Sequence, residues 1–246
     1  MMKPEYTRIF LLSHMRASTS LAGHILGSHP DINGYYEMHL NYEDATVLDK
    51  QLGSYQLTDA LKDNSYYLFD KLLHNDYTLN INIQALSDSK VLVSLQAPDH
   101  TIKSIINLFS KKEIDDLYAS PAGAINYYIE RVQALAAFCQ LNPKKYYYYD
   151  AEVFQVAPTI LLPTLSRWLE LTSPLSEEYQ VFSQTGVAGK GDSSKSIQSQ
   201  KINRTSSDYS HIKLPVDKLN RAQEVYISCR QLIIDNAIDA VIKESS

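Results

Sequence analysis

The chain has 246 residues, of which 44% are hydrophobic and 21% charged, and its formal net charge is −5 at pH 7. This composition is typical of a globular protein that buries a sizeable core. The acidic balance argues against a general nucleic-acid or anionic-membrane partner.

Apolar runs and helical periodicities alternate along the chain, which predicts an α/β class of fold. The expected architecture has three layers, a parallel β-sheet with helices on both faces, in a single domain over residues 1–246. We expect strands at 9–12, 31–36, 65–74, 90–95 and 145–150, a long polar loop at 183–204, and helices from about 20, at 42–62 (interrupted at Gly53), 76–86, 101–109, 121–141, 159–171 and 216–242 (with one break). No apolar run reaches transmembrane length and the first residues lack a signal-peptide pattern, so the expected location is cytoplasmic.

The first strand leads into a hydroxyl-rich loop with one cation, Arg16. Ser18 or Thr19 suits the N-cap of the helix that follows. The first backbone N–H groups of a helix and its dipole attract anions, and Arg16 with the hydroxyls of Ser18, Thr19 and Ser20 would add to that attraction. The alternative, weighted equally for the loop alone, is an ordinary turn whose hydroxyls only cap the helix. No G-x-x-x-x-G-K-[ST] motif occurs, which argues against a nucleoside triphosphate with magnesium.

The order Arg16-Ala17-Ser18-Thr19-Ser20-Leu21 resembles the 5′-phosphosulfate-binding loop of sulfotransferases that use PAPS (3′-phosphoadenosine 5′-phosphosulfate). That loop reads basic-Ser-Gly-[ST]-[ST]-hydrophobic. The resemblance implies that Arg16, Thr19 and Ser20 hold the 5′-phosphosulfate and stabilise the leaving oxygen, which makes Arg16 a candidate catalytic residue. Ala17 stands where Ser is usual, and Ser18 stands where Gly is usual, which restricts the backbone if the loop needs a positive φ.

Residues 29–39 also resemble the "HP-x-I…E-x-H" segment of the bacterial and carbohydrate branch of that family. The resemblance covers about residues 8–202. It implies the sulfotransferase fold, which is P-loop-kinase-like in architecture but has no Walker loop.

The resemblance implies that Glu37 is the base that deprotonates the acceptor. A base in that place is expected to have a pKa raised toward neutrality by burial. His39 is either a competing base or a partner that orients Glu37. The structural alternatives are a solvated loop carboxylate for Glu37 and a capping role for His39.

Lys71 and His74 follow the third predicted strand and resemble the Lys-x-His segment of cytosolic sulfotransferases, with one residue more between them. There the His is the base and the Lys contacts the sulfuryl group, so His74 is a second candidate base and Lys71 a candidate clamp. A strand-end ion pair between Asp70 and a neighbouring cation is the structural alternative.

The family's 3′-phosphate motif has Arg at a strand end, Pro two residues later and Ser eight residues after the Arg. Pro98 and Ser104 match this motif, but Gln96 replaces the Arg. Loss of a charge-assisted contact of this kind costs about 1.5–3 kcal/mol. Lys190, in the late Gly-rich loop, is the expected substitute cation.

Together these motifs imply an enzyme that moves a sulfuryl group from PAPS to a hydroxyl or amine of a small molecule or carbohydrate. No ligand cluster implies a metal, and a homodimer is left open. Two alternatives remain open: a catalytically decayed binding protein with this fold, and an atypical phosphotransferase, which would require magnesium.

Overall fold

The computed structural model describes residues 6–111, 116–187, 195–205 and 207–244. Within these residues, the strands form one parallel sheet in the order β2-β3-β1-β4-β5-β6. The strands are β1 (Thr7–Leu12), β2 (Ile32–Asn33), β3 (Tyr67–Leu72), β4 (Lys90–Leu95), β5 (Tyr147–Asp150) and β6 (Ala240–Val241). The central position of β1 places the loop that follows it in the middle of one edge of the sheet.

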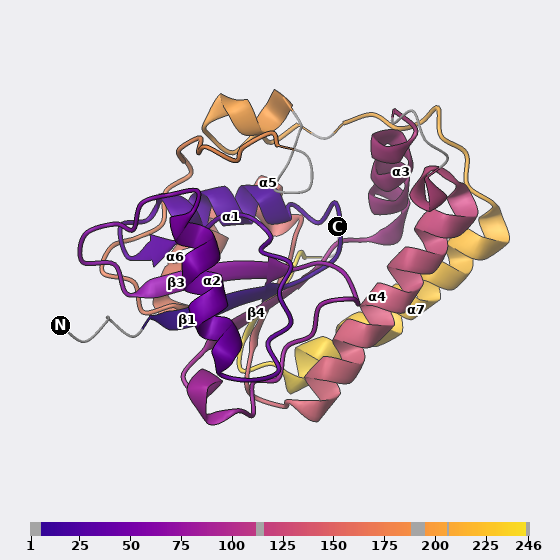
Figure 1. Cartoon of the computed structure of the whole chain (residues 1–246). Coiled ribbons are helices and arrows are strands. Elements are labelled where there is room, and N and C mark those ends of the chain that lie inside the picture. The colour runs from indigo at the N-terminus through magenta and orange to yellow at the C-terminus, as the bar shows by residue number, and fades with distance from the viewer. Residues whose placement is uncertain (1–5, 112–115, 188–194, 206, 245–246) are drawn as a thin grey trace.

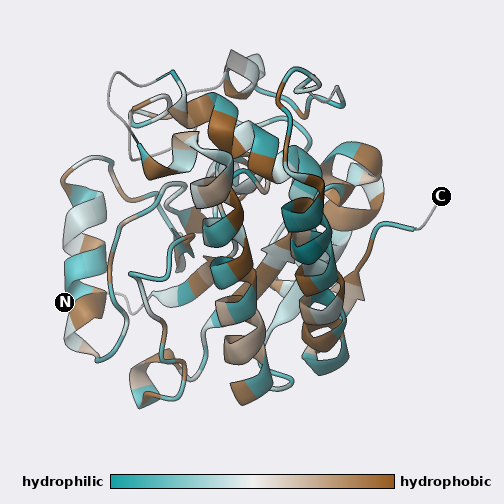
Figure 2. Ribbon diagram, turned by 90° about the vertical axis from the view of Figure 1, so that its right-hand side faces the viewer, coloured by the Kyte–Doolittle hydropathy of each residue, from teal (hydrophilic) through white to brown (hydrophobic). Residues whose placement is uncertain are grey.

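Helices cover both faces of this sheet (Figure 1). One face packs against α3, α4 and α7, and the other against α1, α5 and α6, while α2 packs beside β3. The helices are α1 (Thr19–Ser28), α2 (Thr46–Gln56), α3 (Pro98–Phe109), α4 (Pro121–Leu141), α5 (Val153–Val156), α6 (Pro158–Trp168) and α7 (Val216–Asn236), with short 3₁₀ helices at Gln84–Leu86, Leu117–Ala119 and Lys195–Ser199. Figure 2 looks onto the face where α4 and α7 lie side by side, with hydrophilic residues along much of their outward surface.

Alternate side chains of β1 explain why the sheet is covered twice. Ile9 and Leu11 belong to the cluster under α1 and α6, whereas Phe10 and Leu12 belong to the cluster under α3, α4 and α7. All four are almost completely buried. A strand buried on both faces is a continuous apolar run, which is why this strand was visible in the sequence. The predicted three-layer arrangement is therefore confirmed.

The helix predicted for residues 76–86 is wrong. Only Gln84–Leu86 forms a 3₁₀ helix there. The side chain of Asn41 accepts a hydrogen bond from the Thr78 N–H, and that of Asn80 accepts one from the Asn82 N–H. Asparagine side chains thereby take the N–H groups that a helix would use.

Other details also differ from the prediction, among them the helix expected at 42–62, which is limited to α2. The strand expected at 31–36 is limited to β2, because Gly34 adopts a φ of +92° and its Cα approaches the Phe69 carbonyl so closely that a Cβ would lie 2.5 Å from it. Gly53 does not interrupt α2. The last helix ends at Asn236, where Lys144 donates to the carbonyls of Asp235 and Ala237, and the chain then adds β6 beside β5.

Within the described ranges, no helix combines the length and apolar character needed to cross a bilayer.

Candidate functional site

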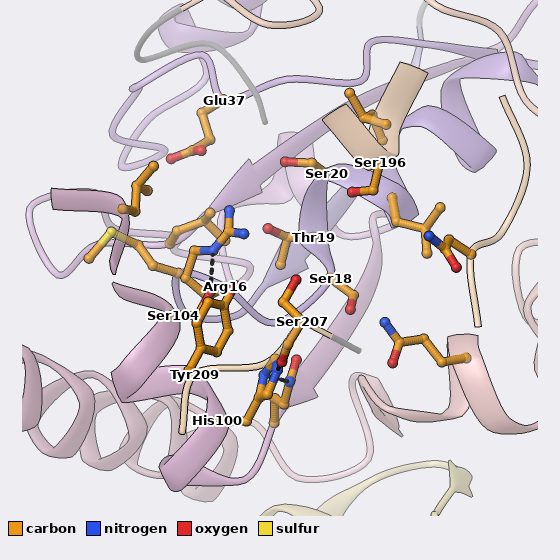
Figure 3. A pocket seen from close by; sticks show the side chains of 18 of the residues that line it. Arg16, Ser18, Thr19, Ser20, Glu37, His100, Ser104, Ser196, Ser207 and Tyr209 are labelled. Carbon is orange, nitrogen blue, oxygen red and sulfur yellow. Dashed lines mark hydrogen bonds between the residues drawn. The ribbon is translucent and has the colours of Figure 1, made fainter. Parts of the chain in front are cut away.

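A cavity of about 440 Å³ opens at the carboxyl ends of β3, β1 and β4. The chain leaves β1 toward β2 and β3 on one side, and later enters β4 on the other side of β1. Parallel sheets bind ligands at this kind of reversal. The cavity walls come from the loop after β1, the segment after β2, the end of β3, helix α3 and residues 196–209 (Figure 3).

The loop before α1 holds two residues in the left-handed region, Arg16 with φ 64° and Ser18 with φ 55°. Ser18 occupies the predicted N-cap position of α1, but its side chain makes no capping hydrogen bond. Thr19 and Ser20 form the first turn and also line the cavity. The positive end of the α1 dipole therefore faces the cavity with no side-chain cap.

Ser18→Gly is expected to raise the free energy of unfolding by about 1 kcal/mol, because a residue with a Cβ costs about 1–2 kcal/mol in the left-handed region and glycine does not. Urea denaturation measures this. The matched control is Ser228→Gly within α7, where glycine should instead destabilise by about 0.5–1 kcal/mol. Equal destabilisation by both substitutions would contradict the expectation.

Arg16 and Ser104, which were predicted from separate motifs, meet in this cavity. Arg16 Nε donates to Ser104 Oγ at 3.0 Å, and Ser104 Oγ donates to Tyr209 Oη at 3.2 Å. The His100 ring lies beside the Tyr209 ring, with centroids 5.0 Å apart, and His100 Nε2 is 3.2 Å from the Ser207 carbonyl oxygen. Figure 3 shows these side chains gathered at one side of the cavity.

Sequence reasoning missed His100, Ser207 and Tyr209. His100 lies four residues before Ser104, so a helix places both on the same face, and that spacing was a usable signal. Tyr209 gave no such signal, because it is 105 residues away from its partner Ser104.

Gln96 brings no positive charge to this side of the cavity. Its side-chain nitrogen lies 3.4 Å from His100 Nδ1, and its side-chain oxygen is buried without a hydrogen-bond partner. Arg16 is thus the charged side chain that the described residues place beside Ser104. Lys190, the predicted substitute cation, lies outside the described residues.

Glu37 lies between the Lys71 ammonium group and the His39 ring. Its carboxylate oxygens are 3.7 Å from Lys71 Nζ and 3.7 Å from His39 Nε2. Burial pushes the pKa of Glu37 up, but the hydrogen bond with His39 and the charge of Lys71 outweigh burial, so that the pKa falls below its ordinary value. The expectation that burial raises the pKa of Glu37 toward neutrality is therefore wrong.

Lys71 is buried behind the cavity wall. Its Nζ lies 3.4 Å from Ser20 Oγ, so it connects the first turn of α1 with Glu37. Among the described residues, the neighbouring Asp70 forms no ion pair of the expected kind. It accepts hydrogen bonds from the backbone N–H groups of Met38 and Lys71 and from the Tyr42 hydroxyl. Burial raises the pKa of Asp70 to about 7. Asp70 thus fixes the backbone on both sides of the Glu37–Lys71 pair.

His74 lines the cavity beside the same pair. Burial lowers the pKa of His74, although the charge of Glu37 opposes that shift. Its ring is therefore neutral at pH 7 and has a nitrogen lone pair that can accept a proton.

His14 joins the ends of β1 and β4 beneath the cavity. One ring nitrogen, Nδ1, lies 2.9 Å from the Met15 carbonyl oxygen, and the other accepts the Gln96 N–H at 3.0 Å. Burial lowers the pKa of this completely buried ring to about 4. The proton on Nδ1 and the acceptor at Nε2 keep the two loops in a fixed relation only while the ring is neutral.

The free energy of unfolding should therefore fall as the pH falls from about 6.5 to about 4, because over this range the unfolded state binds the His14 proton and the folded state does not. The full difference between the two His14 pKa values corresponds to about 3 kcal/mol in the free energy of unfolding. Urea denaturation at about pH 7 and about pH 4.5 should show most of this loss in the natural chain and less of it in His14→Gln. His211→Gln, on an exposed histidine, is the matched control. The same pH dependence in His14→Gln and in the natural chain would contradict the assignment.

The cavity brings together most of the predicted site residues. Those that line it are Arg16, Ser18, Thr19, Ser20, Glu37, His74, Gln96 and Ser104. Ala17 is buried and Lys71 acts from behind Ser20 and Glu37. Among the described residues, no three His, Cys, Asp or Glu side chains gather as metal ligands.

No family model matches the sequence, and no curated protein matches it. Among solved structures, the chain is similar to the sulfotransferase domain from the curacin biosynthetic pathway. The two share 16% identity with a TM-score of 0.61, and the match covers 93% of this chain and 99% of that chain. The likeness shows the fold: the chain has the α/β sulfotransferase fold, as predicted. Its parallel sheet contains five predicted strands and β6, which was not predicted.

Proposed function

We propose that the chain is a PAPS-dependent sulfotransferase that transfers a sulfuryl group to a hydroxyl or amine of a small molecule or carbohydrate. The observation that carries this proposal is the convergence, in one cavity, of residues from four separate segments: the Arg16 loop, Glu37, His74 and Ser104. The sulfotransferase fold supports it. PAPS supplies an activated sulfuryl group; the protein has to bind it, orient it and deprotonate the acceptor.

The residues present fit the two anionic ends of PAPS. The uncapped start of α1, with Thr19 and Ser20, suits the 5′-phosphosulfate. Ser104, Tyr209 and the Arg16 guanidinium suit the 3′-phosphate. This assignment moves Arg16 from the 5′-phosphosulfate, where the resemblance placed it, to the 3′-phosphate, because its guanidinium contacts Ser104. There Arg16 supplies the charge that an arginine at the position of Gln96 would otherwise bring.

We assign proton removal to His74, because its ring is neutral at pH 7, whereas the His39 hydrogen bond and the Lys71 charge lower the pKa of Glu37 and so make its carboxylate a weaker base. His74 takes the proton of the acceptor while the acceptor oxygen or nitrogen bonds to sulfur and the bond from sulfur to the 5′-phosphate oxygen breaks. The α1 terminus, Ser20 and Lys71 stabilise the charge that develops on the departing oxygen. Glu37 orients Lys71.

The second candidate function, a binding protein that has lost catalysis, is favoured by one observation, the neutral Gln96 at the place of the arginine. Binding of the donor alone does not distinguish the enzyme from the binding protein. Transfer of a labelled sulfuryl group from PAPS to one of a panel of acceptors does.

Calorimetric titration of the full chain with PAP, the desulfated product, without added metal, tests the shared donor site. Micromolar binding is expected, with weaker binding of AMP, which lacks the 3′-phosphate. Tyr209→Phe should reduce the affinity for PAP more than that for AMP. Tyr66→Phe, on a partly exposed tyrosine away from the cavity, is the matched control. Absence of heat at millimolar PAP would overturn the donor assignment.

A further inference from the structure

The two sides of the cavity differ in chemistry. In Figure 3, Glu37 and His100 lie at opposite sides with Arg16 between them. Helix α3 runs along the cavity and lines it at every fourth residue, with His100, Ser104 and then Leu108. Side chains at this spacing share one face of a helix, so the α3 wall changes from polar to apolar along its length.

The apolar lining gathers around His74. Leu73 precedes it in the chain, and the Tyr127 ring lies 5.7 Å from the His74 ring. The Tyr127 hydroxyl accepts the Met15 N–H at 2.8 Å and donates to the Leu73 carbonyl at 2.7 Å. Met15 and Leu73, which both line the cavity, are therefore held on either side of the same phenol.

Phe109 belongs to the same wall. Its ring lies 5.2 Å from the Tyr118 ring, which in turn lies 5.3 Å from the Tyr127 ring. Two aromatic rings thus connect the end of α3 with the ring beside His74. Phe109 and Leu108 line the cavity from this end of α3.

The wall is fixed by Arg131 of α4, which is almost completely buried. Its guanidinium donates to the carbonyls of Ser13 at 2.8 Å, Leu72 at 2.6 Å and His74 at 3.2 Å. These carbonyls lie at the ends of β1 and β3, so one side chain holds the backbone under Met15 and under Leu73. The apolar surface is preformed, so a ligand that binds there loses little free energy to the ordering of these side chains.

We infer that the acceptor is a neutral alcohol whose hydroxyl is carried by an apolar body of about one ring, and not a sugar; this inference rests on the function proposed above. The body packs on Met15, Leu73, Leu108 and Phe109, and its hydroxyl faces His74. Four charged or ionisable groups of the described residues act on His74; Glu37 and His39 line the cavity, whereas Arg131 and Asp76 do not. Further hydroxyls of a sugar would lose water there without gaining partners, which is costly for a buried polar group.

The inferred step balances with the donor already named. The alcohol oxygen forms a bond to sulfur, the bond from sulfur to the 5′-phosphate oxygen breaks, and its electron pair leaves with PAP. The alcohol proton moves to His74. The products are a neutral alcohol's sulfate monoester and PAP.

Two compounds that carry a primary alcohol on one six-membered ring test the inference on the full chain: cyclohexylmethanol, and methyl β-glucopyranoside, which adds three secondary hydroxyls. Dissociation constants are measured by NMR titration with and without PAP, and kcat/KM by transfer from PAPS. Each hydroxyl that is buried without a partner lowers the affinity about fivefold or more, so the three secondary hydroxyls of the glucoside should favour cyclohexylmethanol at least about 100-fold. Equal or better binding or transfer with the glucoside would overturn the inference, as would failure of cyclohexylmethanol to bind.

Leu108→Gln tests the wall itself. We expect it to lower the affinity and kcat/KM for cyclohexylmethanol about tenfold while the affinity for PAP stays unchanged. Leu141→Gln, at an exposed position of α4, is the matched control. An unchanged preference in Leu108→Gln would overturn the assignment of the wall. Binding of cyclohexylmethanol that weakens in Leu108→Gln, with no transfer from PAPS, would support the apolar site and defeat only the proposed function.

Discussion

Replacing Arg16 by alanine is expected to weaken PAP binding by about tenfold to 150-fold at pH 7. A hydrogen bond to a charged group contributes about 1.5–3 kcal/mol, and each 1.4 kcal/mol is about tenfold in affinity. Arg16 is the cation that the described residues bring to Ser104, and Gln96 beside it is neutral. Calorimetric titration with PAP measures the effect directly.

Arg16→Lys and Arg167→Ala make the result specific. Lysine keeps the charge but cannot present the two-pronged donor face of a guanidinium, so Arg16→Lys should fall between the natural chain and Arg16→Ala. Arg167 lies on α6 with its side chain 69% exposed, away from the cavity, so Arg167→Ala should bind PAP as the natural chain does. An affinity unchanged in Arg16→Ala would refute the assignment of its guanidinium to the 3′-phosphate.

Much of the sheet could be predicted from local patterns. The apolar runs that become β1 and β4 are buried on both faces, and such strands need no partner to be recognised in a sequence. The strand predicted at 145–150 is observed as β5 (Tyr147–Asp150). Tyr148 packs under α4 and α7, and Tyr149 packs under α1 and α6.

The elements that were wrongly predicted depend on contacts with segments far away in the sequence. β6 has two residues and forms by pairing with the edge of β5. The helix expected at 76–86 is absent where Asn41, 37 residues before Thr78, accepts the Thr78 N–H and Tyr42 pairs with Leu79. A sequence pattern measures the hydrophobic periodicity within a segment. Pairing with a distant segment does not change that periodicity, so the pattern could not show either effect.

The same division holds in the site. Arg16, Glu37, His74 and Ser104 could be predicted because each belongs to a short motif at a strand end. The place of Tyr209 in the site could not be predicted, and neither could the direction in which the pKa of Glu37 shifts. That direction is decided by the 3.7 Å distances to Lys71 and His39, since burial alone would have raised the pKa.

The identity of the base should be visible in the pH dependence of kcat/KM for sulfuryl transfer. If His74 is the base, kcat/KM falls as the pH drops through a pKa below about 6.5, because burial lowers the pKa of His74. If Glu37 is the base, the fall begins only below about pH 4.5, because the pKa of Glu37 is lowered from its ordinary value. We expect the first profile, in which kcat/KM does not depend on pH above the pKa of His74.

His74→Ala should then lower kcat by about 10²–10⁴-fold, which is the usual contribution of a general base, and should abolish the acidic limb of the profile. Glu37→Gln should retain the limb but move it to lower pH, because the Glu37 charge raises the pKa of His74 and its removal lets that pKa fall further. His211→Ala, on an exposed histidine, should keep the natural profile. A limb that disappears in Glu37→Gln and persists in His74→Ala would reverse the roles of the two residues, because only the group that accepts the proton can impose its own pKa on the rate.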